Sequence, residues 1–120
     1  MAEAAQAKTR VVNLFEVPES IQATAGVAEI GMVTLTSDEE LTCYKKAKGD
    51  SAKLATELAK TALVEADGKK LSPGDGTVDT FWKDLDPKLR QLVLTAYADL
   101  HAAPEEDQES FLKSRKQKVG

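Results

Sequence analysis

Cys43 and His101, the single cysteine and the single histidine of this 120-residue chain, are its strongest candidates for catalytic chemistry. A thiol beside an imidazole could act as a nucleophile with its general base. Cys43, however, lies inside an expected helix near Leu41 and Tyr44, which favours a packed and unreactive thiol. His101 has no second histidine or cysteine near it in sequence, and it ends an expected helix, where it would cap the C-terminus. We therefore expect no catalytic residue and no enzyme activity.

Two acidic stretches, 38–40 and 75–79, raise the question of a divalent cation. Neither has the alternating oxygen ligands and closing glutamate of a calcium loop. The sequence Gly74-Asp75-Gly76 is also too short for a phosphate loop and lacks its Gly-Lys-Ser/Thr ending. Helix caps and turns explain these carboxylates better, so we expect no metal site and no cofactor.

Composition excludes several broad classes. A formal net charge of -4 and a pI near 5.0 argue against a general affinity for nucleic acid, which requires a surplus of lysine and arginine. The start of the chain, MAEAAQAKTR, lacks the apolar core of a signal peptide, and no apolar run approaches the length needed to cross a bilayer. One cysteine allows no intramolecular disulfide. We expect a cytoplasmic protein with one modest core and no membrane association.

The strongest helix signal starts at Asp86, which can cap the first backbone N–H groups, and Pro87, which suits the first helical position. Apolar residues then recur at spacings of three and four up to His101, so they share one face. They are Leu89, Leu92, Val93, Ala96, Tyr97 and Leu100.

Further helices are expected at 37–48, 51–66 and 77–85, with the acidic segment 105–112 as a fifth. A capping box formed by Thr36 with Glu39, or by Ser37 with Glu40, would open the first of them. Asp50 would cap the second. Asp67-Gly68 would end that second helix, and 69–76 would follow as a loop from which Leu71 touches the core.

These signals divide the chain into four parts. Residues 1–9 form a flexible N-terminus, 10–35 an arm that is either two short strands or an ordered extended segment, 36–112 a helical domain, and 113–120 a flexible basic tail. The expected fold class is mainly α: a small irregular helical bundle of four to five helices with a β-leaning or extended N-terminal arm.

One buried cluster is expected to hold this bundle together. Phe81-Trp82 is the one aromatic pair, and Trp82 should be mostly buried because so few other aromatics are present. The expected cluster consists of Leu58, Leu63, Trp82, Leu89, Val93, Tyr97 and Leu100.

Basic residues gather on the first two long helices and in the tail that follows the acidic block 105–109. A solvated surface explains them, and the alternative is an electrostatic handle that steers a partner protein. No aromatic stacking platform accompanies them, so nucleic acid is not the expected partner. They are Lys45, Lys46, Lys48, Lys53, Lys60, Lys113, Arg115, Lys116 and Lys118.

The order of these elements over roughly residues 30–115 resembles the small tail assembly chaperones of long-tailed bacteriophages and prophages. The similarity rests on the helix KAKGDSAKLATELAK, the Asp-Gly turn, the Phe-Trp segment and the helix DPKLRQLVLTAYADLH. These are packing motifs, and the family has no catalytic residues to transfer.

The resemblance implies a non-enzymatic protein of the host cytoplasm that binds the tape measure protein and assists assembly of the tail tube around it. In that family a frameshifted longer form commonly recruits the tail tube protein, and homo-oligomers are common. The alternative is a structural virion protein, either a head-tail connector or a capsid accessory, whose β-leaning arm would be the docking strand.

Overall fold

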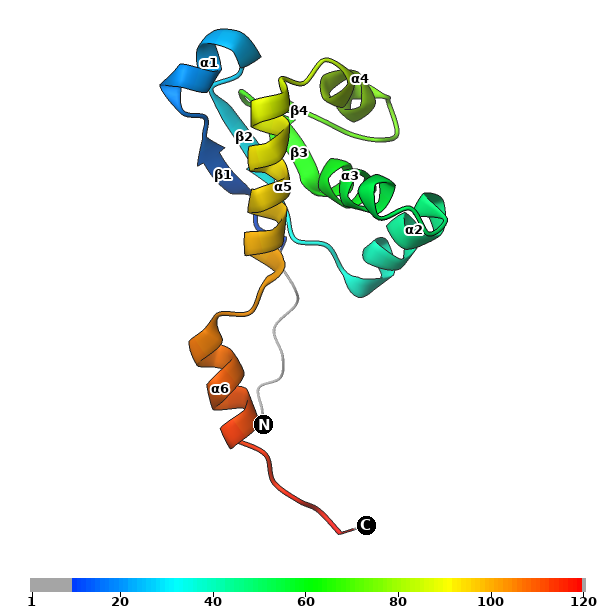
Figure 1. The fold of residues 1–120 in the computed structure, drawn as a ribbon, viewed down its shortest axis with the longest axis vertical. Coiled ribbons are helices and arrows are strands. Elements are labelled where there is room, and N and C mark those ends of the chain that lie inside the picture. The colour runs from blue at the N-terminus through cyan, green and yellow to red at the C-terminus, as the bar shows by residue number, and fades with distance from the viewer. Residues whose placement is uncertain (1–9, 120) are drawn as a thin grey trace.

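The computed structural model describes residues 10–119 (Figure 1), so the expected flexible N-terminus at 1–9 lies outside the described residues. The fold is mainly α and contains a small antiparallel sheet of four strands. Within 10–119, no helix has the length and apolar character needed to span a membrane. The elements are β1 (Asn13–Glu16), α1 (Glu19–Ala25), β2 (Glu29–Met32), α2 (Ser37–Ala47), α3 (Ser51–Ala62), β3 (Leu63–Ala66), β4 (Lys69–Lys70), α4 (Thr77–Lys83), α5 (Pro87–His101) and α6 (Glu105–Lys113).

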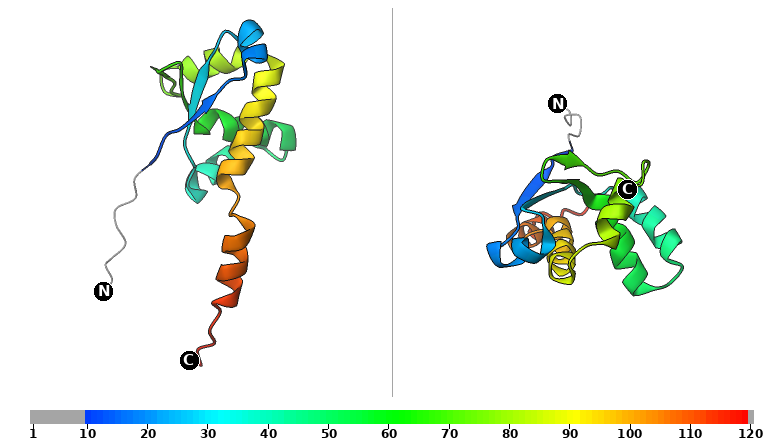
Figure 2. Two further views of the ribbon diagram at one scale, coloured as in Figure 1. Left: turned by 90° about the vertical axis from the view of Figure 1, so that its left-hand side faces the viewer. Right: turned by 90° about the horizontal axis from the view of Figure 1, so that it is seen from above.

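The sheet has the strand order β1-β2-β3-β4, and each neighbouring pair is antiparallel. Phe15 on β1 lies opposite Ile30 on β2, and Ile30 lies opposite Ala66 on β3. Helix α5 crosses one face of the sheet (Figure 2), and α3 packs beside it. The molecule is therefore a layer of helices on a small sheet. The expected mainly α class is confirmed, but the sheet extends beyond the expected β-leaning arm to β3 and β4.

The predicted helix 51–66 is too long by its last four residues. Helix α3 ends at Ala62, and the next four residues form β3. Asp67 and Gly68 have φ values of 51° and 79°, the left-handed geometry of a tight two-residue hairpin turn. They join β3 to β4, so the predicted loop 69–76 also begins too early. Asp67 Oδ1 accepts hydrogen bonds from the N–H groups of Ala28 and Glu29 at 2.9 Å each, which fixes the hairpin against the start of β2.

The N-terminal region contains the two short strands that were one of the two expected alternatives. Between them lies helix α1, which the sequence did not predict. Pro18 precedes this helix without a side-chain cap, and Gly26 ends it at a φ of 70°. Ile21 and Ala25 hold it against the core, so packing stabilises a helix whose local signals are weak.

The predicted starts of the longer helices are confirmed. Thr36 and Glu39 form the capping box of α2. Asp50 accepts a hydrogen bond from the N–H of Lys53 at the start of α3, and Asp86 accepts one from the N–H of Lys88 at the start of α5. Each carboxylate satisfies a backbone donor that the first turn of a helix leaves free.

The core lies between the sheet, α3 and α5. Leu63, Leu89 and Val93 are fully buried, as predicted. Trp82, Tyr97, Leu100 and Leu71 are partly buried against them. Leu58 differs from the prediction, because it is partly exposed and faces a surface hollow on α2 and α3.

Candidate functional site

His101 is held by two backbone groups. Its Nε2 accepts a hydrogen bond from the N–H of Leu35 at 2.8 Å, and its Nδ1 lies 2.8 Å from the carbonyl oxygen of Tyr97. This pattern assigns the proton to Nδ1, which donates to Tyr97. The imidazole also stacks on the Tyr97 ring, with centroids 3.9 Å apart. His101 therefore caps the end of α5, as expected. It does so through the hydrogen bonds of a neutral imidazole and not through a positive charge at the helix end.

Tyr97 extends this contact to α2. Its hydroxyl donates a hydrogen bond of 2.7 Å to Glu40 Oε2. Burial raises the pKa of the Tyr97 phenol, and the hydrogen bond to the Glu40 carboxylate raises it further. We call the group formed by Leu35, Glu40, Tyr97 and His101 the clasp. The clasp joins the end of α5 to the start of α2, so its hydrogen bonds have a structural role.

Cys43 and His101 contact different residues. The thiol is buried, and its Sγ lies 3.3 Å from Thr61 Oγ1 on α3. The imidazole nitrogens face Leu35 and Tyr97, so the structure does not form the nucleophile and base pair that the two side chains could provide. Cys43 is a packed thiol between α2 and α3.

Burial of Cys43 predicts slow chemical modification. The native thiol should react with an aromatic disulfide reagent about 100-fold more slowly than the urea-unfolded thiol, because reagent access requires local opening of α2 from α3. Absorbance of the released thiolate measures both rates. Cys43→Ser protein supplies the blank, and equal rates for folded and unfolded protein would contradict the packed position.

The acidic stretches serve as caps and ion pairs. Glu39 accepts hydrogen bonds from Arg10 and from the Thr36 backbone, and these hold the pKa of its carboxyl below the usual value. Asp75 accepts from the N–H and hydroxyl of Thr77 in a turn. Asp79 pairs with Lys60 at 2.6 Å. Across 10–119, no group of three or more histidine, cysteine, aspartate or glutamate residues is placed to hold a metal ion.

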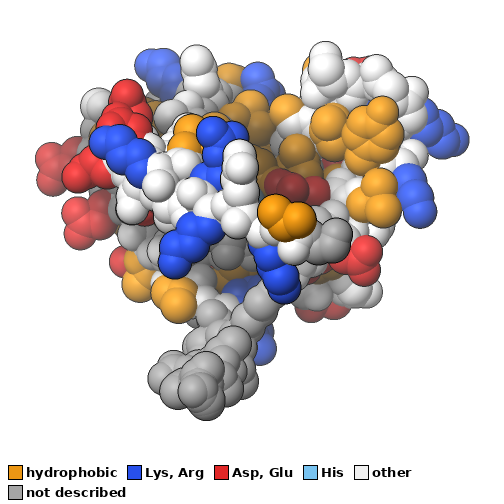
Figure 3. All heavy atoms as spheres, turned by 90° about the horizontal axis from the view of Figure 1, so that it is seen from below, with side chains coloured by type: hydrophobic (Ala, Val, Ile, Leu, Met, Phe, Trp, Pro, Cys, Tyr) orange, Lys and Arg blue, Asp and Glu red, His pale blue; other side chains and the backbone are white. Residues whose placement is uncertain are grey.

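Two exposed apolar side chains mark a hollow of about 390 Å³ on α2 and α3. Leu41 is 49% exposed and Tyr44 is 60% exposed, and Leu54 and Leu58 line the same hollow from α3. We call these four residues the α2–α3 surface. Seen from below, hydrophobic side chains gather over α2 with lysine or arginine side chains at the edge of the group (Figure 3). Of these four residues, only Leu58 was expected in the buried cluster, and the structure leaves it partly exposed.

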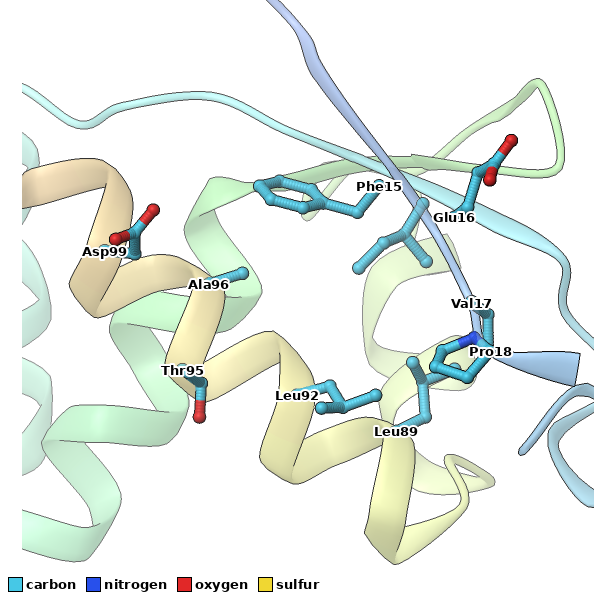
Figure 4. A pocket seen from close by; sticks show the side chains of 10 residues that line it. Phe15, Glu16, Val17, Pro18, Leu89, Leu92, Thr95, Ala96 and Asp99 are labelled. Atoms are coloured by element: carbon cyan, nitrogen blue, oxygen red, sulfur yellow. The ribbon is translucent and has the colours of Figure 1, made fainter. Parts of the chain in front are cut away.

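A second apolar hollow, of about 360 Å³, lies between β1 and α5. Figure 4 shows Phe15, Val17 and Pro18 facing Leu89, Leu92 and Ala96 of α5 across it. We call it the β1–α5 groove. Sequence reasoning missed this groove because it treated β1 as part of a separate arm.

An acidic hollow shares part of its lining with the β1–α5 groove. Glu16, Val17 and Pro18 line both, and the second hollow, of about 440 Å³, adds Glu19 and Glu29. Glu16 pairs with Glu29 one position beyond Phe15 and Ile30, so the two carboxylates lie on the face of the sheet opposite α5.

Helix α6 projects away from the remainder of the fold, as Figure 1 and the left view of Figure 2 show. None of its nine residues is buried against the described part of the chain. Phe111 is 76% exposed and Leu112 is 70% exposed. Its N-terminal half is acidic, it ends at Lys113, and Arg115, Lys116 and Lys118 follow.

Comparison of the chain with protein-family models, curated proteins and solved structures finds no match. The candidate sites therefore depend on geometry alone. The exposed hollows are lined by side chains suited to packing, and the polar clusters are engaged in caps, turns and the clasp.

Proposed function

We propose that this protein is a non-enzymatic tail assembly chaperone of a long-tailed phage or prophage, which acts in the host cytoplasm. Its α2–α3 surface binds the tape measure protein and keeps that protein available while the tail tube protein assembles around it. The observation that carries this proposal is the exposed apolar hollow formed by Leu41, Tyr44, Leu54 and Leu58.

The α2–α3 surface suits an amphipathic helix. Leu41 and Tyr44 are three residues apart on α2, and Leu54 and Leu58 are four apart on α3, so each pair lies on one helix face. A third helix can place its apolar stripe between two such rows. The exposed ammonium groups on α2 favour a partner with acidic positions beside that stripe.

A tape measure protein has the matching chemistry, because it is a long helical chain that tends to form coiled coils. Its apolar stripe must be covered until assembly. The sequence resemblance to tail assembly chaperones supports the same assignment.

Substitution of the α2–α3 surface tests this function. Leu41→Asp combined with Tyr44→Asp should weaken binding to the tape measure protein of the encoding phage by about tenfold or more, because two central apolar contacts are lost. The measurement is the soluble fraction and co-purification of that protein after co-expression. Both positions are largely exposed, so the variant should keep its fold.

Leu14→Asp is the matched control, since Leu14 is similarly exposed, at 56%, but lies on β1. It should keep the tape measure protein soluble as well as the native chain does. A tape measure protein that aggregates equally with the native chain present would contradict the proposal, as would full activity of the double variant.

A structural virion protein is the second candidate, and β1 favours it. Among the described residues, β1 has a neighbouring strand on one side, and Leu14 and Val11 beside its free edge are exposed. Such an edge can add a strand from a capsid or connector subunit. Mass spectrometry of purified particles separates the candidates, because a chaperone leaves the mature virion and a subunit remains. In the second case Leu14→Asp should reduce incorporation.

A further inference from the structure

We propose that the face of the sheet opposite α5 binds a basic amphipathic helix of a partner protein. This inference goes beyond the proposed function, because it concerns a different surface and a partner helix of the opposite charge. We call this surface the outer sheet face, and it consists of Val12, Leu14, Glu16, Glu29, Gly31 and Glu65.

The outer sheet face has no cover within residues 10–119. Side chains alternate between the two faces of a strand, and Phe15 and Ile30 pack in the core beneath α5. In the right view of Figure 2 the described helices lie on the α5 side of the sheet, and none covers the opposite side. The solvent face of an antiparallel sheet is normally polar, but Val12 and Leu14 are 41% and 56% exposed. These two side chains leave apolar area for another element to cover.

Gly31 brings a carboxylate to the centre of this face. A Cβ atom at position 31 would clash with Cγ of Glu65 and would lie 3.1 Å from its carboxyl carbon. The Glu65 side chain therefore lies over β2 in the space that the glycine leaves. The same Cβ atom would lie 2.9 Å from Cγ1 of Val12, so the acidic and the apolar side chain lie next to each other over Gly31.

The charge of the outer sheet face is not balanced by the described part of the chain. Glu16 lies directly opposite Glu29, and like charges at such a position repel each other. The acidic hollow adds Glu19 beside them. Lys70 is the cross-strand neighbour of Glu65, but no ion pair joins them within residues 10–119. A cation from a partner would relieve this repulsion, so charge complementarity selects a basic partner.

One helix matches the dimensions of this face. Strands β1 and β3 are two strand spacings apart, about 10 Å, which is the diameter of one helix. Leu14 and Glu16 are about 7 Å apart along β1, and a helix advances about 6 Å over four residues. A helix that lies along β1 with an apolar residue on Leu14 therefore places a residue four positions away above Glu16. The expected partner helix carries an apolar stripe with lysine or arginine at that spacing, and it adds a third layer to the fold.

Two designed peptides test the outer sheet face of the full chain. The basic probe is a helical peptide of about 14 leucine and lysine residues with the leucines on one face, and the acidic probe has glutamate in place of every lysine. In an NMR titration the basic probe should shift the backbone amides of 12–16, 29–31 and 65. The acidic probe should bind this face at least about tenfold more weakly, because its carboxylates meet those of the sheet.

A charge reversal with a matched control separates this site from a general attraction to an acidic protein. Glu16→Lys with Glu29→Lys should weaken binding of the basic probe by about tenfold or more. Glu105→Lys with Glu106→Lys makes the same change in net charge on α6. That control should change the affinity by less than about twofold, because charges far from the binding surface are screened.

Glu16→Gln with Glu29→Gln is the second sheet variant. It removes the repulsion between the two carboxylates, so it should raise the melting temperature while it weakens the basic probe, which separates loss of binding from loss of the fold. Leu41→Asp with Tyr44→Asp should not weaken this probe, because the α2–α3 surface shares no residue with the outer sheet face. Three results would overturn the proposal: amide shifts confined to other surfaces, equal weakening by the two charge reversals, or equal affinity of the outer sheet face for both probes.

Discussion

Val93→Asp is expected to unfold the protein at ambient temperature. Val93 lies on α5 with none of its side chain exposed, and it belongs to the same buried cluster as Leu63 and Leu89. An aspartate there would bury a carboxylate without a partner, which costs several kcal/mol, or would pull α5 away from the sheet. A domain of this kind has a total stability of only about 5–15 kcal/mol, so one such change consumes most of it.

Circular dichroism and thermal melting measure the outcome. The native chain should show a cooperative transition, and Val93→Asp should show none or a transition lowered by about 15 °C or more. Leu92→Asp is the matched control, because Leu92 is the adjacent residue of α5 but faces the β1–α5 groove with 38% of its side chain exposed. Equal melting of the native and Val93→Asp proteins would refute the packing of α5 on the sheet.

The parts of this fold that the sequence predicted are those set by local interactions. Asp86 and Pro87 define the start of α5 within a few residues, and Thr36 with Glu39 does the same for α2. Each of these contacts joins residues close in the chain, so the residue types and their spacing contain the whole signal. The core residues of α5 follow from the same periodicity.

The parts that the sequence missed depend on contacts between distant segments. Leu63–Ala66 continues the apolar pattern of α3, but pairing with β2 makes it a strand. Asp67-Gly68 was identified as a stop signal, although the same dipeptide is a strong hairpin signal when strands flank it. Helix α1 similarly depends on packing against the core, because Pro18 gives it no side-chain cap.

The candidate surfaces were harder to predict than the fold. Leu41, Tyr44, Leu54 and Leu58 have the spacing of a buried stripe, and periodicity alone cannot distinguish a face that meets the core from one that meets a partner. The β1–α5 groove joins residues more than seventy positions apart, from Phe15 to Leu89, so no local pattern could indicate it. His101 illustrates the reverse case, because its position at a helix end suggested a cap, but its bond to Leu35 depends on tertiary structure.

Replacement of His101 should test how much the clasp contributes. His101→Leu removes the acceptor for the Leu35 N–H, the donor to the Tyr97 carbonyl and the stacked ring, while keeping an apolar side chain at the site. A partly buried backbone donor without a partner costs about 1–3 kcal/mol. Urea unfolding should show a loss of that size, and hydrogen exchange at the Leu35 amide should accelerate by about tenfold or more.

His101→Gln separates the hydrogen bond from the rest of the clasp. The glutamine side chain can offer an amide oxygen to the Leu35 N–H but cannot stack on Tyr97. It should therefore restore much of the protection of the Leu35 amide while recovering only part of the unfolding free energy. Tyr97→Phe adds the complementary control, since it keeps a ring for His101 to stack on and removes the bond to Glu40. If His101→Leu leaves both the Leu35 exchange rate and the unfolding free energy unchanged, the clasp does not hold α5 to α2, and the order of α2 must come from its packing on α3 through Cys43 and Ala47.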